Sequence, residues 1–361
     1  MPSRFAVSVL LASVWTVAVL AQESDVVIGS IKDRYSLKAC GADGRMLLGR
    51  DSLDRTGHWS PEHSHWSLLG VSRDGSLVTF QFPEGLEPTL AAYDGSDVVV
   101  LSVDLHPRVL DPHDLQPSGP RYEMLRFDNQ ANLLTQQQVS IDFDPAQMAV
   151  LPSGSTMVVG GYREAGEDEV KNVGAVLDTG GQILKRFAFP LPPQGGGWTF
   201  VTYRMVAGDA AAYMVLYSYD PAATGIAKIS EDGQLDIKII PNPPYNDQRH
   251  HNQWLFGPGV AVEMYHYVGE RSTFHFDEYD VDSGQRTASR FAFISGGGSG
   301  CYWRDEVSMQ AASFHVDPAR GLPPDTLRLV FAKLHDQPVS MPVVNPEACH
   351  CAQADNHHAD H

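Results

Sequence analysis

Histidine, tryptophan, tyrosine and arginine gather in a few short segments of this 361-residue chain. The densest segment is residues 58–66, where His63 and His65 lie two positions apart beside Glu62. A His-x-His pair can offer two imidazoles to one ion, and a carboxylate or a distant histidine can complete the site. We name His63, His65 and His250 as candidate ligands of a divalent metal such as Zn, Cu or Ca. The alternative is that they are ordinary exposed loop residues, because a His-x-His pair alone is a weak signal.

Aromatic and arginine side chains form a second candidate set. Several of them follow glycine-rich segments such as residues 195–197 and 296–300, where the backbone can approach a ligand closely. Side chains of this kind, projecting from loops, can stack on sugar rings, aromatic groups or a peptide. The alternative is that they pack inside the fold. The candidate ligand-binding residues are Trp59, Trp198, Arg249, Trp254, Tyr302, Trp303 and Arg304.

Familiar catalytic motifs are missing from the sequence. It contains no Gly-x-Ser-x-Gly, no His-Glu-x-x-His and no Gly-Lys-Ser/Thr phosphate loop. A pair of catalytic carboxylates stays open, because the separation of such a pair is a spatial quantity. The net charge of −18 argues against nucleic acid or anionic membrane surfaces as partners, since both are held mainly by Lys and Arg.

The elements that must position these residues are short β-strands joined by Gly turns. One set of turns recurs about every 50–60 residues, and a second set follows each first turn after about 25–35 residues. Four short strands per unit at this period predict an all-β fold, a six-bladed β-propeller. The first turns are Asp43-Gly44, Asp94-Gly95, Ser153-Gly154, Gly208-Asp209 and Pro258-Gly259. The second turns are Asp74-Gly75, Asn129-Gln130, Gly180-Gly181, Asp232-Gly233 and Ser283-Gly284.

The sixth unit has too few strands of its own. Residues 307–316, 326–334 and 339–344 supply its first three strands in this prediction, and residues 25–31 at the other end of the chain supply the fourth. The ring is then closed by N- and C-terminal strands in the last blade, which leaves no long unpaired edge. Five blades with a cap, or seven with one degenerate unit, are the alternatives.

This spacing and these turn residues resemble secreted bacterial six-bladed propellers of the NHL or TolB kind. The resemblance covers nearly the whole mature chain, but only at the level of the fold, so it carries over no functional residue. In a propeller with strands a to d in each blade, the a–b and c–d turns share one face, here called the turn face. The b–c loops and the crossings between blades share the other, here called the loop face. We expect all the candidate residues to lie on the loop face, with Trp198 and Trp303 on the same side.

The two ends predict export. Residues 1–21 read as a signal peptide, with Arg4 before a mostly apolar run and small residues at the −3 and −1 positions before Gln22. A retained N-terminal anchor is the alternative. We expect a propeller domain over residues 22–345, a disordered Cys/His-rich tail over 346–361, a secreted or periplasmic location, and no membrane span once the signal is cleaved.

Four cysteines in an exported chain favour a disulfide. In the predicted register Cys40 lies near the turn face, and so do Cys349 and Cys351, whereas Cys301 lies at the opposite side. The sequence therefore predicts a link from Cys40 to Cys349 or Cys351.

Two functions follow from these observations. The first is an exported module that binds a protein, peptide or carbohydrate ligand on its loop face. The second is a metal-assisted lyase or hydrolase, in which an ion held by loop histidines polarises an oxygen or activates water.

Overall fold

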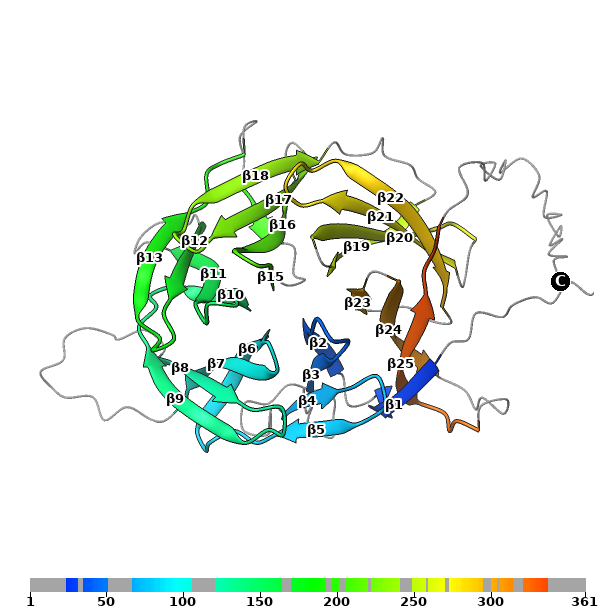
Figure 1. Cartoon of the computed structure of the whole chain (residues 1–361), viewed down its shortest axis with the longest axis horizontal. Coiled ribbons are helices and arrows are strands. Elements are labelled where there is room, and N and C mark those ends of the chain that lie inside the picture. The colour runs from blue at the N-terminus through cyan, green and yellow to red at the C-terminus, as the bar shows by residue number, and fades with distance from the viewer. Residues whose placement is uncertain are drawn as a thin grey trace, which may run out of the picture.

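The computed structural model shows six antiparallel sheets arranged as a ring around one axis (Figure 1). It describes residues 24–31, 35–50, 67–105, 121–163, 170–192, 197–200, 205–219, 222–240, 249–257, 259–269, 273–294, 300–303, 305–313 and 321–336. Within these ranges the chain is all-β, and no helix has the length and apolar composition that a membrane span needs. The predicted six-bladed propeller is confirmed.

Five blades are built from consecutive strands, running outward from the axis. Blade one holds β2 (Tyr35–Cys40), β3 (Met46–Arg50), β4 (Ser67–Val71) and β5 (Leu77–Phe80). Blade two holds β6 (Leu86–Asp94), β7 (Asp97–Asp104), β8 (Arg121–Phe127) and β9 (Leu133–Val139). Blade three holds β10 (Asp144–Val150), β11 (Thr156–Arg163), β12 (Val170–Leu177) and β13 (Ile183–Ala188).

Blades four and five each carry an extra strand. In blade four, β14 (Thr199–Phe200) and β15 (Val206–Ala207) both pair with β16 (Ala211–Tyr219), and β17 (Ala222–Ser230) and β18 (Leu235–Ile240) follow. Blade five holds β19 (Arg249–Gly257), β20 (Val260–Tyr267), β21 (Thr273–Asp280) and β22 (Arg286–Phe293). Its outer edge is covered by β26 (His335–Asp336), which the sequence did not predict.

The last blade is shared between the two ends of the chain. It runs outward through β23 (Gly300–Trp303), β24 (Glu306–Ser313), β25 (Thr326–Lys333) and β1 (Ser24–Ser30). Figure 1 shows β1 lying beside β25, and Ser24 pairs with Phe331 while Ser30 pairs with Thr326. An ion pair between Arg328 and Asp25 joins the same two strands. The predicted closure by the N-terminal strand is confirmed.

The strands of blade six differ from the prediction in their order. The axial strand is β23, which contains Cys301 and Trp303, and the segment predicted as strand a is the second strand, β24. The short strand was overlooked because it has only four residues and follows a glycine-rich run that reads as a crossing. Cys301 and Trp303 therefore lie on an innermost strand rather than in a loop.

The hairpin turns take the backbone conformations that their residues favour. Gly75 and Gly233, in two of the c–d turns, have φ values of 87° and 77°, a region that glycine adopts at little cost. In blade two no glycine is available, and Ala131 adopts a φ of 65° instead. Asp128 stabilises this turn, because its carboxylate accepts hydrogen bonds from the N–H groups of Gln130 (2.9 Å) and Asn132 (2.8 Å).

Apolar side chains fill the seams between blades. The strands in the middle of each sheet are buried on both faces, as in β7, whereas outer strands such as β9 are mostly exposed. In the closing seam, Val26 and Ile28 of β1 belong to one cluster with Leu48 of blade one and Leu329 of β25. Each blade thus depends on its neighbours for burial, which makes the ring one cooperative unit.

Candidate functional site

A cavity of about 890 Å³ lies on the axis of the ring, toward the turn face. Its wall is formed by the ends of the innermost strands of all six blades and by the a–b turns that follow them. The volume falls in the range of ligand pockets in proteins, about 300–1,000 Å³. This cavity is the candidate functional site that the described residues support.

The wall differs between the two sides of the cavity. Blades one to four contribute mainly small side chains, and blades five and six contribute larger aromatic ones. The small side chains include Ala39, Ala91, Ala149, Ala207 and Ala211, and the aromatic ones are Phe256, Tyr302 and Trp303 of blades five and six, with Tyr93 of blade two and Tyr213 of blade four. A ligand can therefore approach the backbone closely at the alanines and contact ring surfaces on several blades.

The innermost strands also present polar backbone groups to the axis. Each is the end strand of its sheet, so one of its two edges has no neighbouring strand among the described residues. The N–H groups of Leu151 and Gly208 bond to Ser155 and Ala211 of the next strand out. Because peptide groups alternate in direction along a strand, those of the preceding residues, Val150 and Ala207, point toward the axis.

Three aromatic side chains of the cavity wall are each covered by a cation of the protein. The guanidinium of Arg45 lies 5.1 Å from the centre of the Tyr93 ring, the Lys228 ammonium lies 5.9 Å from the Tyr213 ring, and the Arg73 guanidinium lies 5.7 Å from Trp303. Such cation–π contacts hold the rings and the long side chains in place. The mouth of the cavity is therefore an ordered surface.

The same cations also tie neighbouring blades together. Arg45 donates hydrogen bonds to the Gly95 and Ser96 carbonyl oxygens of blade two. Lys228 of blade four lies 2.5 Å from an Asp282 oxygen of blade five, and this hydrogen bond raises the pKa of the lysine. Arg73 of blade one pairs with Glu306 of blade six.

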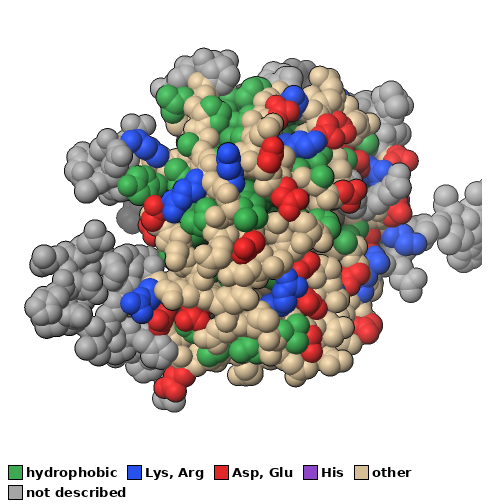
Figure 2. Space-filling view, turned by 60° about the vertical axis from the view of Figure 1, so that its left-hand side comes forward, with side chains coloured by type: hydrophobic (Ala, Val, Ile, Leu, Met, Phe, Trp, Pro, Cys, Tyr) green, Lys and Arg blue, Asp and Glu red, His purple; other side chains and the backbone are tan. Residues whose placement is uncertain are grey.

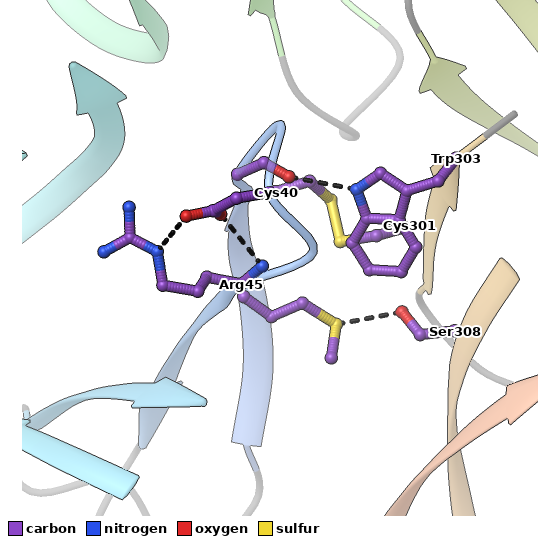
Figure 3. Close-up of a disulfide and its surroundings, with 8 residues drawn as sticks. Cys40, Arg45, Cys301, Trp303 and Ser308 are labelled. Carbon is purple, nitrogen blue, oxygen red and sulfur yellow. Dashed lines mark hydrogen bonds and ion pairs between the residues drawn. A yellow bond between two sulfur atoms is a disulfide. The ribbon is translucent and has the colours of Figure 1, made fainter. Parts of the chain in front are cut away.

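Figure 3 shows how blades six and one join beside the cavity. Cys40 of β2 and Cys301 of β23 form a disulfide with their Cα atoms 5.8 Å apart. Beside it, Trp303 Nε1 donates a hydrogen bond of 3.0 Å to the Gly41 carbonyl oxygen, and Ser308 Oγ lies 2.9 Å from the Met46 sulfur. The predicted pairing of Cys40 with Cys349 or Cys351 is wrong, because β23 brings Cys301 to the turn face.

Aspartates recur in the hairpin turns of the turn face, both between the outer strands and nearer the axis. The c–d turns of five blades each carry an aspartate, and hydrogen bonds from groups of the same turn hold the pKa of four of them below its usual value. These four are Asp74, Asp128, Asp232 and Asp280. Nearer the axis, Asp94 is paired with Arg126 (2.6 Å), while Asp209 has no ion pair within the described part of the chain.

The outer side of the ring looks different. In the view of Figure 2, acidic and basic side chains are interspersed among polar and apolar ones over the side of the molecule that carries blades two and three.

The structure separates the aromatic residues that the sequence predicted as one surface. Trp198 is 6% exposed and packs in the seam of blades three and four, beside the loop-face end of β16. Trp254 is 7% exposed, in the next seam. Tyr302 and Trp303 line the axial cavity at the turn face. The expectation that Trp198 and Trp303 share a face is wrong, because β23 is itself the axial strand.

Tyr302 is held in place by its hydroxyl group, which donates a hydrogen bond of 2.5 Å to Glu278. Burial first, and this carboxylate second, raise the pKa of the phenol well above its usual value. Arg290 lies 2.8 Å from the same carboxylate. The hydroxyl is therefore occupied in positioning the ring, and the side chain, only 2% exposed, supports the wall from the core of blades five and six.

Several predicted residues cannot be placed. Trp59, His63, His65 and Arg304 lie outside the described residues. The backbones of Arg249 and His250 belong to β19, but their side chains lie outside what is described. Among the described residues, no three His, Cys, Asp or Glu side chains form a group that could hold a metal ion. The metal site stays a prediction.

Sequence reasoning missed the residues that build the cavity mouth. Arg45, Arg73 and Lys228 are separated by more than 25 residues from one another, and each contacts a ring from a different strand. No local pattern in the sequence signals these contacts, because each cation and its ring are brought together only when neighbouring strands and blades pack.

Comparisons with known proteins identify no family. No family model and no curated protein sequence matches the chain. Solved structures match at low identity. A subtype N10 neuraminidase-like protein of A/little yellow-shouldered bat/Guatemala/060/2010 has a TM-score of 0.45 and 8% identity, covering 86% of this chain and 98% of that chain. A neuraminidase-like protein from A/bat/Guatemala/164/2009 has a TM-score of 0.46 and 10% identity, covering 88% and 91%.

A third similar structure is the Pyrococcus horikoshii acylaminoacyl peptidase (orthorhombic crystal form). Its TM-score is 0.41 and its identity 10%, and the match covers 79% of this chain and 44% of the peptidase. Similarities of this size carry no argument about what this chain does.

Proposed function

We propose that this protein is an exported binding module that takes its ligand in the axial cavity from the turn face. The observation that carries the proposal is the cavity itself, about 890 Å³ with a wall drawn from all six blades. Its small side chains leave room for a ligand, and its aromatic rings offer apolar surface.

The rigidity of the mouth supports a binding role. Ion pairs, cation–π contacts and one disulfide connect neighbouring blades around the cavity. A wall that is already ordered loses little conformational entropy when a ligand binds, which favours affinity. The Cys40–Cys301 disulfide also supports export, because such bonds persist in oxidising compartments.

The cavity can be tested by filling it. Ala207 lines the cavity and is exposed, so Ala207→Trp places an indole in the space without displacing core side chains. Ala188→Trp, the same substitution on the exposed outer strand of blade three, is the matched control. Both variants and the native protein are incubated with a defined pool of random heptapeptides, oligosaccharides and small aromatic compounds, and retained compounds are identified by mass spectrometry.

We expect compounds that the native protein and Ala188→Trp retain and that Ala207→Trp does not. Equal retention by all three proteins, or no retention of any pool member, contradicts binding in the cavity.

The metal-assisted lyase or hydrolase is the alternative that the sequence left open. Its histidines, His63 and His65, lie outside the described residues, so it stays a prediction. Metal analysis of the purified mature protein tests it: a stoichiometric ion that disappears in a His63→Ala/His65→Ala variant supports the alternative, and metal-free protein contradicts it.

A further inference from the structure

We infer that the ligand of the axial cavity is an extended polypeptide segment, in which apolar residues enter the cavity and flanking lysine or arginine residues contact its rim. The inference rests on the proposed function and names the class of ligand. Three features of the cavity carry it: free strand edges, small apolar walls and an acidic surround.

The strand edges favour a polypeptide over other ligands. The peptide groups of Val150 and Ala207 point toward the axis from neighbouring blades, and neither has a strand to pair with on that side among the described residues. An exposed strand edge is a template for an added strand, because backbone N–H and C=O groups on both sides are satisfied together. The side chain of Ala207 is only a methyl group, so it does not cover the free backbone edge of β15.

The walls favour apolar residues in the middle of the segment. Ala42 and Ala207 are exposed in the cavity wall, and the rings of Tyr93, Tyr213 and Trp303 are half-buried there, whereas Met148, Ala149 and Val150 pack mainly in the seams between blades. Apolar side chains gain free energy by leaving water for such walls, at about 25 cal/mol per Å² of area buried. A sugar would instead need polar side chains in the wall, and among the described wall residues most of the polar ones already have partners within the protein.

The charge around the mouth favours basic flanks. Asp209 lines the cavity without an ion pair in the described part of the chain, and Asp94 and Asp97 share Arg126. The three cations of the mouth are each paired with a carboxylate, Arg45 with Asp43, Arg73 with Glu306 and Lys228 with Asp282, so they do not offset this negative charge. Farther out, aspartates such as Asp74 and Asp232 have lowered pKa values, so they stay charged in mild acid. The negative charge of these carboxylates attracts lysine and arginine side chains of a peptide and repels acidic segments. Dissolved salt weakens both effects.

The test begins with a random heptapeptide library selected on the native protein, with Ala207→Trp and Ala188→Trp as before. We expect the selected peptides to contain an apolar centre and an excess of Lys and Arg over the starting library, and to be lost from Ala207→Trp only. Should Ala207→Trp fold poorly, as judged by its urea unfolding midpoint, Ala42→Trp in an exposed turn of the cavity wall replaces it.

Three synthetic forms of the best peptide then separate the contributions. Replacing its basic residues by glutamate should weaken binding at least 10-fold. The other two forms are N-methylated at every second amide, one at the odd positions and one at the even positions, and we expect one of these two to bind at least 10-fold more weakly than the parent peptide. Asp209→Asn should weaken binding about threefold and reduce the salt dependence. Equal affinity of the parent and both N-methylated peptides overturns backbone pairing, and equal or tighter binding of the glutamate form overturns the charge argument.

The outcomes distinguish the inference from the proposed function. If no heptapeptide is enriched but a small molecule or oligosaccharide is lost from Ala207→Trp alone, the polypeptide inference is wrong and the binding cavity stands. If the selected peptides bind Ala207→Trp and Ala42→Trp with the same affinity as the native protein, the polypeptide inference and the proposed binding cavity are both wrong.

Discussion

The Cys40–Cys301 disulfide offers the strongest quantitative test of the closed ring. It joins residues 261 positions apart, so it closes a loop that includes most of the described chain. The chain-entropy relation assigns about 5–6 kcal/mol to a crosslink over such a loop, and removal of native disulfides typically costs about 2–5 kcal/mol. We expect the double variant Cys40→Ala/Cys301→Ala to lose about 4 kcal/mol of unfolding free energy.

Urea unfolding measures this loss directly. With a slope of about 3 kcal/mol per molar urea, a loss of 4 kcal/mol lowers the midpoint by about 1.3 M. A reductant should lower the midpoint of the native protein to that of the double variant, and should leave the double variant unchanged. A midpoint within about 0.3 M of the native value, or a reductant effect of equal size in both proteins, contradicts a stabilising crosslink between these residues.

Three further predictions concern the fold. Gly160→Ala should lose more than about 2 kcal/mol of unfolding free energy, since its new Cβ would lie 1.8 Å from a backbone oxygen of the neighbouring strand; Gly197→Ala, with open space around it, is the control and should leave the urea midpoint unchanged. Arg328→Ala should cost about 3 kcal/mol because it removes a buried guanidinium that forms an ion pair with the carboxylate of Asp25 across the closing strands, and Arg328→Lys should recover part of the lost midpoint. Burial raises the pKa of Tyr122 to about 12, so the neutral phenol stabilises the fold fully below pH 10 and loses that contribution as the pH rises toward 12. Tyr122→Phe should therefore lose less stability than native protein between pH 10 and 12, and parallel stability curves would contradict this.

Local chemistry explains which parts of the fold could be predicted from sequence. The hairpin turns are determined within four or five residues: Asp74 bonds the N–H of Ser76 at 2.9 Å, and Gly75 adopts a left-handed φ that most residues avoid. Repetition of such turns sets the number of blades. Closure by residues 25–31 could also be predicted. The N-terminal strand lacks a partner in its own blade and the last blade lacks an outer strand, so pairing the two covers both open edges.

The errors share a physical cause, which is that they depend on distant contacts. The four residues of β23 form a strand only because β24 pairs with them, and neither length nor propensity marks them as one. Once β23 is misplaced, Cys301 and Trp303 move to the wrong face. The cavity depends on how closely six strand ends converge, which no local pattern records.

The pairing of β1 with β25 has a consequence for biosynthesis. Asp25 and Arg328, which meet in the finished ring, are 303 positions apart. At about 5–20 residues per second, the ribosome needs about 15–60 s to make the chain between them. For that time β1 has no partner strand, and its Val26 and Ile28 side chains have no seam to enter. A nascent chain interrupted before residue 326 would keep two open sheet edges, so aggregation or a chaperone that covers β1 should compete with completion of the ring.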